Sequence, residues 1–310
     1  MDEAELDEPG LRALLRAQHP DLADLALCPA PLGWDNQLWR LGDELAVRLP
    51  RTERAPGLLR KEHTWLPRLA PRLPLPVPVP LRLGEPTARF PKPWTIAAWV
   101  PGEPADRAPI SRGHHAADAL AGFLRALHRQ APPDAPTSRL RSVPLGTHIA
   151  GMDAQFRDVA TRVPRAVLDV WHDALAAPGW AGPPVWLHGD LHPANTVVAD
   201  GTLAGIVDFG ELCAGDPAAD LAAAWLLLPA GADTRFFEVY APADEATIRR
   251  ARGWAVLLGV MLVCIGQAGE RGLPGGKPTW APAGTKALDR VLASVWSGPG
   301  PGVAHRKLPD

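Results

Sequence analysis

Asp190, Asn195 and Asp208 carry the side-chain oxygens that give this 310-residue sequence its clearest chemical signal. Asn195 and Asp208 flank two short apolar runs joined by Asp200-Gly201, a dipeptide that favours a β-hairpin. Because a hairpin brings its two ends side by side, we expect Asn195 and Asp208 to lie together, with Asp190 on the loop before them. Carboxylate and amide oxygens are ligands that Mg²⁺ prefers, and phosphate oxygens and water can complete its coordination. The spacing therefore predicts one pocket for magnesium and a phosphate.

The residues around these three side chains resemble a known enzyme family. H-G-D-L-H-P-A-N at residues 188–195, followed by I-V-D-F-G at 206–210, is similar to the aminoglycoside phosphotransferase family of antibiotic kinases. D-x-x-x-x-N followed by D-F-G is also the spacing of the catalytic and metal-binding segments of protein kinases. The resemblance implies an α+β, bilobal protein-kinase-like fold, with a small β-rich N-terminal lobe containing one main helix and a larger, mostly helical C-terminal lobe.

The same resemblance implies roles for the site residues. Asp190 accepts the proton of the substrate hydroxyl or orients that hydroxyl, while Asn195 and Asp208 hold Mg²⁺. His188 and His192 are expected to support the catalytic loop; for His188 we favour hydrogen bonding over proton transfer.

The first third of the chain contains candidate residues for binding the nucleotide. In kinase-like folds a hairpin loop covers the phosphates, and a Lys on the third strand pairs with a helix Glu. Here L-A-V-R places Arg48 where Lys is usual, and Glu62 is its expected partner. Arg keeps the positive charge and can hold phosphate through two hydrogen bonds. The phosphate loop would be Gly33-Trp34-Asp35-Asn36, with Asn36 or Gln37 as donors because the loop has a single Gly.

The hinge between the two lobes is predicted at Ala98, Trp99 and Val100, whose backbone groups would hydrogen-bond a purine base. The stretch Trp99–Glu103 resembles the W-x-P-G-E segment that is common in the family. Trp34 and Trp99 are candidates for lining the nucleotide cleft.

The elements that must position these residues follow from hydrophobic spacing. Helices are predicted over residues 5–19, 58–70, 114–130, 152–177, 218–228, 246–270 and 284–296. Strands are predicted at 38–41 and 45–49 around a Gly42-Asp43 turn, at 93–100, and within 185–208. Residues 71–86 alternate Pro with Leu and Val, which suits an extended loop or edge strand. We therefore expect a nucleotide-binding lobe over residues 1–102, ending at the hinge, and a helical lobe over 103–310 with the catalytic loop, metal site and acceptor pocket. The tail at 298–310 is expected to be loose.

Composition limits the function classes. Thirty-two Lys and Arg against 34 Asp and Glu give a net charge of −2, which argues against nucleic-acid binding because that needs a basic excess. Three dispersed cysteines argue against a disulfide framework. The acidic start is unlike a signal peptide, and the apolar run at 253–266 is too short to span a bilayer. We expect a cytoplasmic protein that binds neither nucleic acid nor membrane.

Other polar residues have structural roles in this interpretation. Asp216 and Asp220 are expected to cap and anchor the helix that follows them. His128 is expected to be a buried, hydrogen-bonded histidine within an apolar helix. Cys213 has no evident His partner, so a nucleophilic role is not expected.

The resemblance implies a small-molecule kinase. It would transfer the γ-phosphate of ATP or GTP to a hydroxyl of an antibiotic of the aminoglycoside, macrolide, peptide or nucleoside type, and would thereby confer resistance. No long activation segment follows D-F-G, which argues against a protein substrate. Between Glu211 and Arg250, seven acidic residues against three basic ones lean towards a cationic acceptor.

Three alternatives remain. Related kinases act on choline, homoserine or sugar derivatives, so the chain could be a metabolite kinase. A metal-dependent hydrolase could use the H-x-D-x-H spacing of His188, Asp190 and His192 to bind zinc, but it leaves Arg48, Glu62 and D-F-G unexplained. A catalytically inactive nucleotide-binding module is disfavoured because all three site residues are present.

Overall fold

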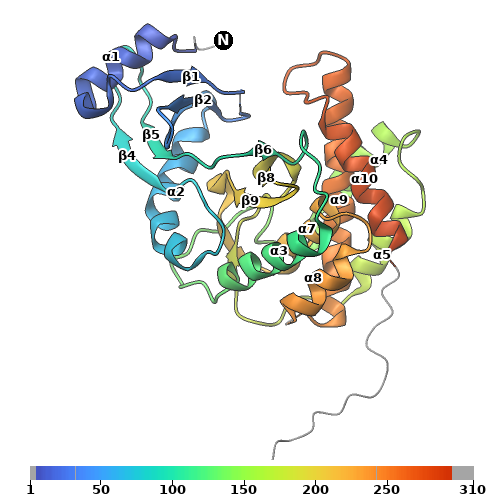
Figure 1. Ribbon diagram of the computed structural model, residues 1–310. Coiled ribbons are helices and arrows are strands. Elements are labelled where there is room, and N and C mark those ends of the chain that lie inside the picture. The colour runs from blue at the N-terminus through green and yellow to red at the C-terminus, as the bar shows by residue number, and fades with distance from the viewer. Residues whose placement is uncertain (1–4, 32, 242, 295–310) are drawn as a thin grey trace, which may run out of the picture.

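A five-stranded sheet forms the N-terminal part of the computed structural model, which describes residues 5–31, 33–241 and 243–294. The strands lie in the order β1-β2-β3-β5-β4, and every neighbouring pair is antiparallel. They are β1 (Leu27–Pro29), β2 (Asn36–Leu41), β3 (Leu45–Pro50), β4 (Pro80–Gly84) and β5 (Trp94–Ala98). The Pro-rich segment thus contributes β4 at the edge, where a strand that starts with Pro is tolerated. Figure 1 shows this sheet on one side of the molecule and most of the helices on the other.

The two faces of the sheet have different functions because side chains alternate along each strand. Val47 and Leu49 of β3 point to one face and pack with helix α1 (Glu8–Gln18) in a core of their own. Arg48 points to the opposite face, towards helix α2 (Ala55–Leu69), which carries Glu62. The alternation therefore separates an apolar face from one that can bind charge.

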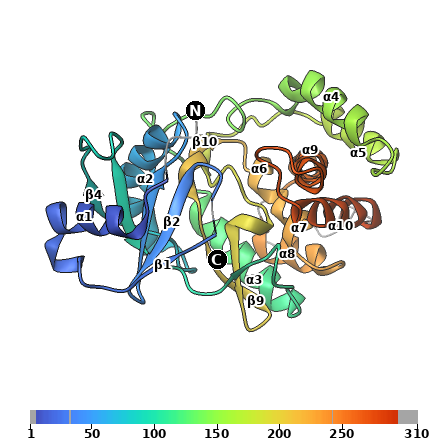
Figure 2. The same ribbon diagram turned by 90° about the horizontal axis from the view of Figure 1, so that it is seen from above.

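The C-terminal part is built around one long helix. The buried core there is continuous and includes fully buried Trp171, Trp225 and Trp254. Figure 2 shows α4 and α5 lying next to each other beyond α9 and α10. The helices of this part are α3 (Gly113–Leu127), α4 (Ile149–Val159), α5 (Val167–Ala176), α6 (Ala218–Leu221), α7 (Ala223–Leu227), α8 (Ala232–Tyr240), α9 (Glu245–Glu270) and α10 (Trp280–Ala293).

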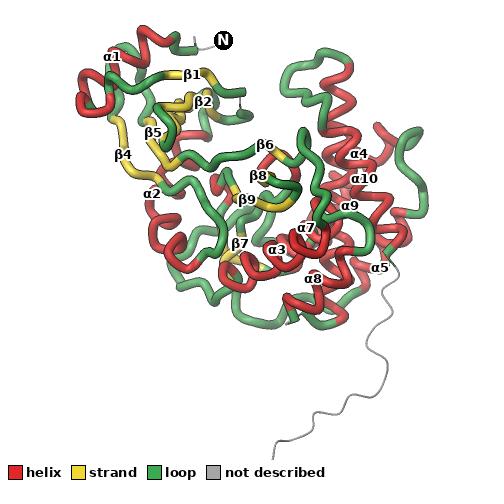
Figure 3. The backbone as a smooth tube through the Cα atoms, in the orientation of Figure 1, coloured by secondary structure: helices red, strands yellow, loops and turns green. Residues whose placement is uncertain are grey.

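Two small sheets sit among these helices and carry the chemistry-bearing segment (Figure 3). One has the order β6-β8-β9, formed by β6 (Glu103–Pro104), β8 (Thr196–Ala199) and β9 (Thr202–Ile206). The other pairs β7 (Val185–Leu187) with β10 (Cys213–Gly215). Because β6 directly follows the predicted hinge, its pairing with β8 joins the chain leaving the large sheet to the site hairpin.

The structure corrects several predicted elements. The helix expected over 152–177 is two helices, α4 and α5, because Pro164 disfavours helical backbone at the residue before it. The helix expected over 218–228 is likewise two short ones, α6 and α7. Helix α8 and the short strands β1, β6 and β10 were not predicted. The 298–310 tail lies outside the described residues.

Helix α9 is long and apolar enough to cross a membrane by length and composition alone. In the structure, 72% of its most apolar 18-residue window is buried against the rest of the chain. The apolar run at 253–266 thus belongs to a longer helix that packs in the buried core.

Gly84 tests the packing of the large sheet. A Cβ at this position would lie 1.9 Å from the ring of Trp94, which is fully buried. We expect Gly84→Ala to lower the free energy of unfolding by about 3 kcal/mol, since a clash with a buried ring forces the sheet apart. Gly122→Ala, inside α3 with no atom within 4 Å of the added Cβ, is the matched control and should raise it by about 0.5–1 kcal/mol. Urea unfolding measures both; equal values for Gly84→Ala and wild type would contradict the packing described.

Candidate active site

The β8–β9 hairpin brings its two ends together, as its sequence predicts. Thr196 pairs with Ile206, and the N–H of Val207 donates to the carbonyl of Asn195 at 2.9 Å. Asp208 follows with a left-handed backbone (φ 62°), and its Oδ1 accepts from Gly210 N at 3.4 Å. Its side chain is about half exposed, so the carboxylate is accessible to solvent.

Asp190 and Asn195 are in direct contact. Asn195 Nδ2 donates to the backbone carbonyl of Asp190 at 2.9 Å and to its Oδ2 at 3.1 Å. His192 lies beside both, with Nδ1 accepting from Ala194 N at 3.3 Å and Nε2 at 3.5 Å from Asp190 Oδ2. The segment therefore gathers Asp190, Asn195 and His192 in one cluster.

His188 forms hydrogen bonds with the backbone on both sides of the site. Its Nε2 donates to the carbonyl of Val207 at 3.0 Å, and its Nδ1 accepts from the N–H of Asp190 at 3.1 Å. The ring is fully buried against Phe209. Because both ring nitrogens are engaged with the backbone, His188 is not arranged to ligate a metal together with Asp190 and His192, which disfavours the zinc-hydrolase alternative.

Asp220 anchors the same loop from the outside. Its buried carboxylate accepts from the N–H of His188 at 2.7 Å and of Gly189 at 2.9 Å, and lies 3.3 Å from His128 Nε2. Burial alone would raise the pKa of Asp220. The contacts with His128, His188 and the Gly189 N–H lower it by more than burial raises it, so the pKa lies below its usual value. His128 also contacts the Tyr240 hydroxyl at 2.8 Å. The expectation that Asp220 caps and anchors the helix after it is wrong, because Asp220 lies within α6 and its carboxylate holds the loop at His188 and Gly189. Asp216 accepts from Ala218 N at the start of α6, as expected. The buried, hydrogen-bonded side chain expected for His128 is present.

Arg48 connects helix α2 to the metal segment. Its Nη1 lies 2.5 Å from Glu62 Oε2, and its Nη2 lies 3.5 Å from Asp208 Oδ1. Burial raises the pKa of the Glu62 carboxyl, and the adjacent Arg48 opposes that rise. The Arg48–Glu62 pair expected from the sequence is therefore present, and Arg48 also faces Asp208.

The phosphate loop differs in detail from the sequence expectation. Gly33 N donates to Asn36 O at 3.1 Å, which closes a tight turn. The carboxylate of Asp35 accepts from the Thr52 hydroxyl at 2.6 Å and from Arg54 at 2.6 and 3.0 Å, so it is turned towards the start of α2. The side-chain amide of Gln37 is bonded to the backbone of Leu6 through both its oxygen and its nitrogen. Gln37 is therefore not positioned as a phosphate donor.

Two cross-contacts tie this loop to the C-terminal part. Arg54, which holds Asp35, also donates to Glu211 Oε1 at 2.9 Å, directly after the D-F-G segment. Trp34 stacks on Trp280 at the start of α10, with ring centroids 6.4 Å apart. Trp280 in turn packs edge-on against His192 at 4.8 Å. The predicted phosphate loop thus contacts the surroundings of Asp190 through two aromatic rings.

The predicted hinge has part of its backbone already engaged. Ala98 N donates to Val79 O at 2.9 Å, and Trp99 N donates to Glu44 O at 2.7 Å. These two N–H groups complete the edges of the sheet and are not available to a base. The ring of Trp99 is covered by Arg40 at 5.5 Å, and Val100 is buried.

Sequence reasoning missed Arg54, Trp280 and Arg141. Arg141 lies in the Pro-rich loop before α4, and its Nη2 is 3.6 Å from Asp190 Oδ1. Burial raises the pKa of Asp190, but His192, Arg141 and His188 together hold it well below its usual range. Arg54, Trp280 and Arg141 lie outside the H-G-D-L-H-P-A-N and D-F-G motifs, so no motif marks them.

The donor set fits magnesium. Asn195 uses Nδ2 towards Asp190, which leaves Oδ1 as its coordinating atom. Asp208 supplies a carboxylate from the residue after Val207, whose N–H donates to the Asn195 carbonyl. Among the described residues no group of three or more His, Cys, Asp and Glu side chains could hold a metal on its own. Mg²⁺ does not need such a cage, because it is commonly bound by one or two carboxylates together with substrate phosphates and water.

Cys213 is fully buried, and burial raises the pKa of its thiol to about 11. It is therefore a thiol rather than a thiolate near neutral pH, which agrees with the absence of a nucleophilic role.

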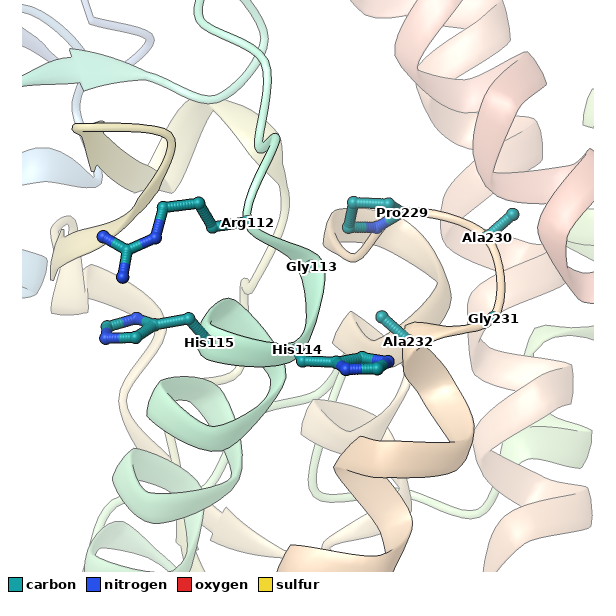
Figure 4. A pocket seen from close by; sticks show the side chains of 8 residues that line it. All are labelled: Arg112, Gly113, His114, His115, Pro229, Ala230, Gly231 and Ala232. Carbon is teal, nitrogen blue, oxygen red and sulfur yellow. The ribbon is translucent and has the colours of Figure 1, made fainter.

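A separate surface depression lies where α3 begins, beside the turn that precedes α8 (Figure 4). Ser111 N and Arg112 N there donate to Gly201 O, so the depression is at the turn of the β8–β9 hairpin, the end opposite to Asn195 and Asp208. Figure 4 shows the side chains of Arg112 and His115 on one side and that of His114 near Ala232 on the other. The polar groups diverge, so this depression is not a candidate active site.

Comparison with known proteins places this geometry in context. The profile of the phosphotransferase enzyme family matches residues 26–254, more than half of the chain. An aminoglycoside 3'-phosphotransferase from Streptomyces fradiae is 28% identical over 183 residues, which cover 53% of this chain and 64% of that protein. The match therefore spans just under two thirds of that relative.

Solved structures share the fold at lower identity. The GDP complex of wild-type aminoglycoside 2'-phosphotransferase-IIIa aligns with a TM-score of 0.68 at 18% identity, over 93% of this chain and 99% of that one. Macrolide 2'-phosphotransferase from Brachybacterium faecium, solved as the apoenzyme, gives a TM-score of 0.60 at 21% identity, over 91% and 98%. The predicted α+β kinase-like fold, with a β-rich N-terminal and a helical C-terminal part, is confirmed.

Substitution of Asp220 tests whether its carboxylate holds the loop at His188 and Gly189. We expect Asp220→Asn to lower the free energy of unfolding by about 3 kcal/mol at pH 7, because it removes the buried charge that two N–H groups solvate and that faces His128. The pKa of Asp220 is lower in the folded state than in the unfolded chain, so its stabilisation is present above about pH 4 and is lost as pH falls below that value.

The measurement is urea unfolding of wild type and variant between pH 3 and pH 8. The difference in the free energy of unfolding between wild type and Asp220→Asn should become smaller only below about pH 4. Asp118→Asn is the matched control, because Asp118 also pairs with a basic side chain, Arg235, but is exposed; its effect should be much smaller. A variant as stable as wild type at pH 7 would contradict the anchoring role.

Proposed function

This chain belongs to the phosphotransferase enzyme family, and from that premise we propose that it transfers the γ-phosphate of ATP or GTP to a hydroxyl group of an antibiotic. The observation that carries the proposal is the convergence of Asp190, Asn195 and Asp208 opposite the Arg48–Glu62 pair. An inactive nucleotide-binding module would not need an oriented carboxylate beside the metal ligands.

The nucleotide is bound between the large sheet and the β8–β9 hairpin. Arg48, held by Glu62 and facing Asp208, contacts the α- and β-phosphates. Asn195 Oδ1 and the Asp208 carboxylate would hold Mg²⁺, whose charge would offset that of the phosphates. Because two hinge N–H groups are engaged in the sheet, the base contacts carbonyl groups of the 98–100 segment or the backbone of Val100.

Asp190 orients the acceptor hydroxyl. An anionic carboxylate whose pKa lies well below its usual range is a weak base, so removing the proton before the new P–O bond forms is unfavourable. Asp190 therefore accepts a hydrogen bond from the hydroxyl, directs its oxygen at the γ-phosphorus and takes the proton as bond formation proceeds.

The charge pattern that leaned towards a cationic acceptor has a different explanation. Six of the seven acidic residues between Glu211 and Arg250 are engaged within the chain. Their partners are Arg54 for Glu211, Arg250 for Asp216, His128 for Asp220, Ser294 for Asp233, Arg235 for Glu238 and the N-terminus of α9 for Asp244. The acceptor need not be a polycation, and both aminoglycosides and macrolides are candidates, as the named relatives suggest.

We extend the proposal to location and organisation. The protein acts in the cytoplasm, where nucleoside triphosphates are available, with residues 1–102 as the nucleotide lobe and 103–310 as the acceptor lobe. Its expression would protect a sensitive cell from the antibiotic it modifies.

Formation of ADP or GDP tests the proposal. We expect turnover with either ATP or GTP to rise when one hydroxylated antibiotic is added from a panel of aminoglycosides, macrolides, peptide and nucleoside antibiotics, and mass spectrometry to show the acceptor heavier by one phosphate. Stimulation by choline, homoserine or a sugar instead would favour the metabolite kinase. No stimulation by any antibiotic would overturn the antibiotic assignment.

Asp190→Asn tests the role of the carboxylate. We expect kcat to fall by about 10²–10⁴-fold, the range for loss of a positioned acid–base group, while the Kd of the Mg–nucleotide changes less than threefold. Asp134→Asn, at an exposed position in the loop before α4, is the control and should leave both unchanged. Unchanged kcat in Asp190→Asn would rule out the mechanism.

A further inference from the structure

We propose that Arg141 is a positioning residue for phosphoryl transfer, fixing the peptide of Gly189 and the carboxylate of Asp190 from outside the catalytic segment. The catalytic consequence rests on the proposed function; the positioning itself can be measured without it.

Arg141 contacts two consecutive residues of the catalytic loop. It is 8% exposed, and its Nε donates to the carbonyl of Gly189 at 2.7 Å. Its Nη2 lies 3.6 Å from Asp190 Oδ1. A guanidinium is planar and carries donors in a fixed arrangement, so one rigid group sets the peptide and the carboxylate relative to each other.

The two oxygens of Asp190 therefore have different partners. Oδ2 faces Asn195 Nδ2 at 3.1 Å and His192 Nε2 at 3.5 Å, whereas Oδ1 faces Arg141. Contacts on both oxygens fix the rotation of the carboxylate about its last bond. Without Arg141, Oδ1 loses its charged partner and the carboxylate is held from one side only.

Gly189, the residue before Asp190, cannot supply the contact to Asp190 Oδ1. Gly189 has φ +82°, and a Cβ there would lie 2.5 Å from the carbonyl oxygen of Glu211. The tight turn thus excludes a side chain at the position where the H-R-D loop of protein kinases carries an Arg. Arg141 provides a guanidinium to the loop from a segment 48 residues earlier.

The loop that carries Arg141 is itself held in place. Ser138 Oγ accepts from the N–H groups of Leu140 and Arg141 at 3.1 and 3.2 Å, and Ser142 Oγ accepts from Ser138 N at 2.8 Å. His148 Nε2 donates to Leu140 O at 3.0 Å. These side-chain-to-backbone bonds close a compact turn, so the Arg141 backbone is a fixed support.

The guanidinium has a rigid surface behind it. Its central carbon lies 5.6 Å from the ring centroid of Trp254, which is 1% exposed within α9. An aromatic face within about 6 Å attracts a cation and restricts its movement. Arg141 thus transmits the position of the C-terminal core to Asp190.

The kinetic test compares three variants. We expect Arg141→Gln to lower kcat about 100-fold, because displacement of a reacting group by about 1 Å costs that much, with the KM for nucleotide changed less than threefold. Arg141→Lys keeps the charge but lacks the planar group of donors, so its kcat should fall about 10-fold. Arg139→Gln, exposed in the same loop, should match wild type.

A second measurement does not depend on the acceptor. Hydrogen exchange of the backbone amides in residues 186–192 should be faster in Arg141→Gln and Arg141→Lys than in wild type, and unchanged in Arg139→Gln. If Arg141→Gln does not fold, the Lys variant supplies both readouts. If wild type phosphorylates no antibiotic, the proposed function fails while the exchange result still decides the positioning role.

Two outcomes would overturn the proposal. One is wild-type kcat and wild-type exchange in both Arg141 variants. The other is a parallel loss of kcat, nucleotide affinity and thermal stability, without faster exchange confined to the catalytic loop, which would make Arg141 a general packing residue.

Discussion

The buried carboxylate of Asp220 is the constraint on which the site depends. A charge taken out of water must be matched by hydrogen bonds and opposite charge. Asp220 obtains these from the N–H groups of His188 and Gly189 and from His128. The N–H groups of His188 and Gly189 must therefore point towards Asp220 in α6. Gly189 must take its left-handed conformation for the chain to turn. Asp190 directly follows this turn, so the direction of its side chain depends on the solvation of a different, buried acid.

The remaining charges of the site link separate parts of the chain. Arg48 belongs to the large sheet and faces both Glu62 of α2 and Asp208 of the hairpin segment. Arg54 holds Asp35 of the phosphate loop and Glu211 at the other side. Half of the Arg54 side chain is exposed, so the water around it screens these contacts and they contribute little to stability. Their consequence is geometric, because they set where the predicted phosphate loop lies relative to Glu211.

Local signals made the core of the site predictable. The Asp200-Gly201 turn and its flanking apolar runs determine a hairpin, and a hairpin necessarily joins Asn195 to Asp208. The Arg48–Glu62 pair was expected from the resemblance to kinase-like folds, in which a basic residue on the third strand pairs with a helix Glu. Contacts between distant segments had no such signal: Arg141 sits in a Pro-rich loop, and Trp280 begins a helix that was expected to start at residue 284. Pro164 is a local signal for the break between α4 and α5, but the apolar spacing on either side of it led to the prediction of one helix over 152–177.

The distribution of partners around Asp190 explains why Arg141, which lies outside the motif, is among them. A carboxylate that orients a hydroxyl must be anionic, fixed in rotation and still open on one side. Asn195 and His192, on the same loop, reach only Oδ2. The preceding residue is Gly189, whose conformation leaves no room for a side chain. Control of Oδ1 therefore has to come from another segment, and a buried guanidinium does this while also keeping the carboxylate ionised. Asp220 fixes the backbone at His188 and Gly189, which leaves no side chain beside Asp190 Oδ1. Arg141 therefore supplies the contact that fixes this oxygen.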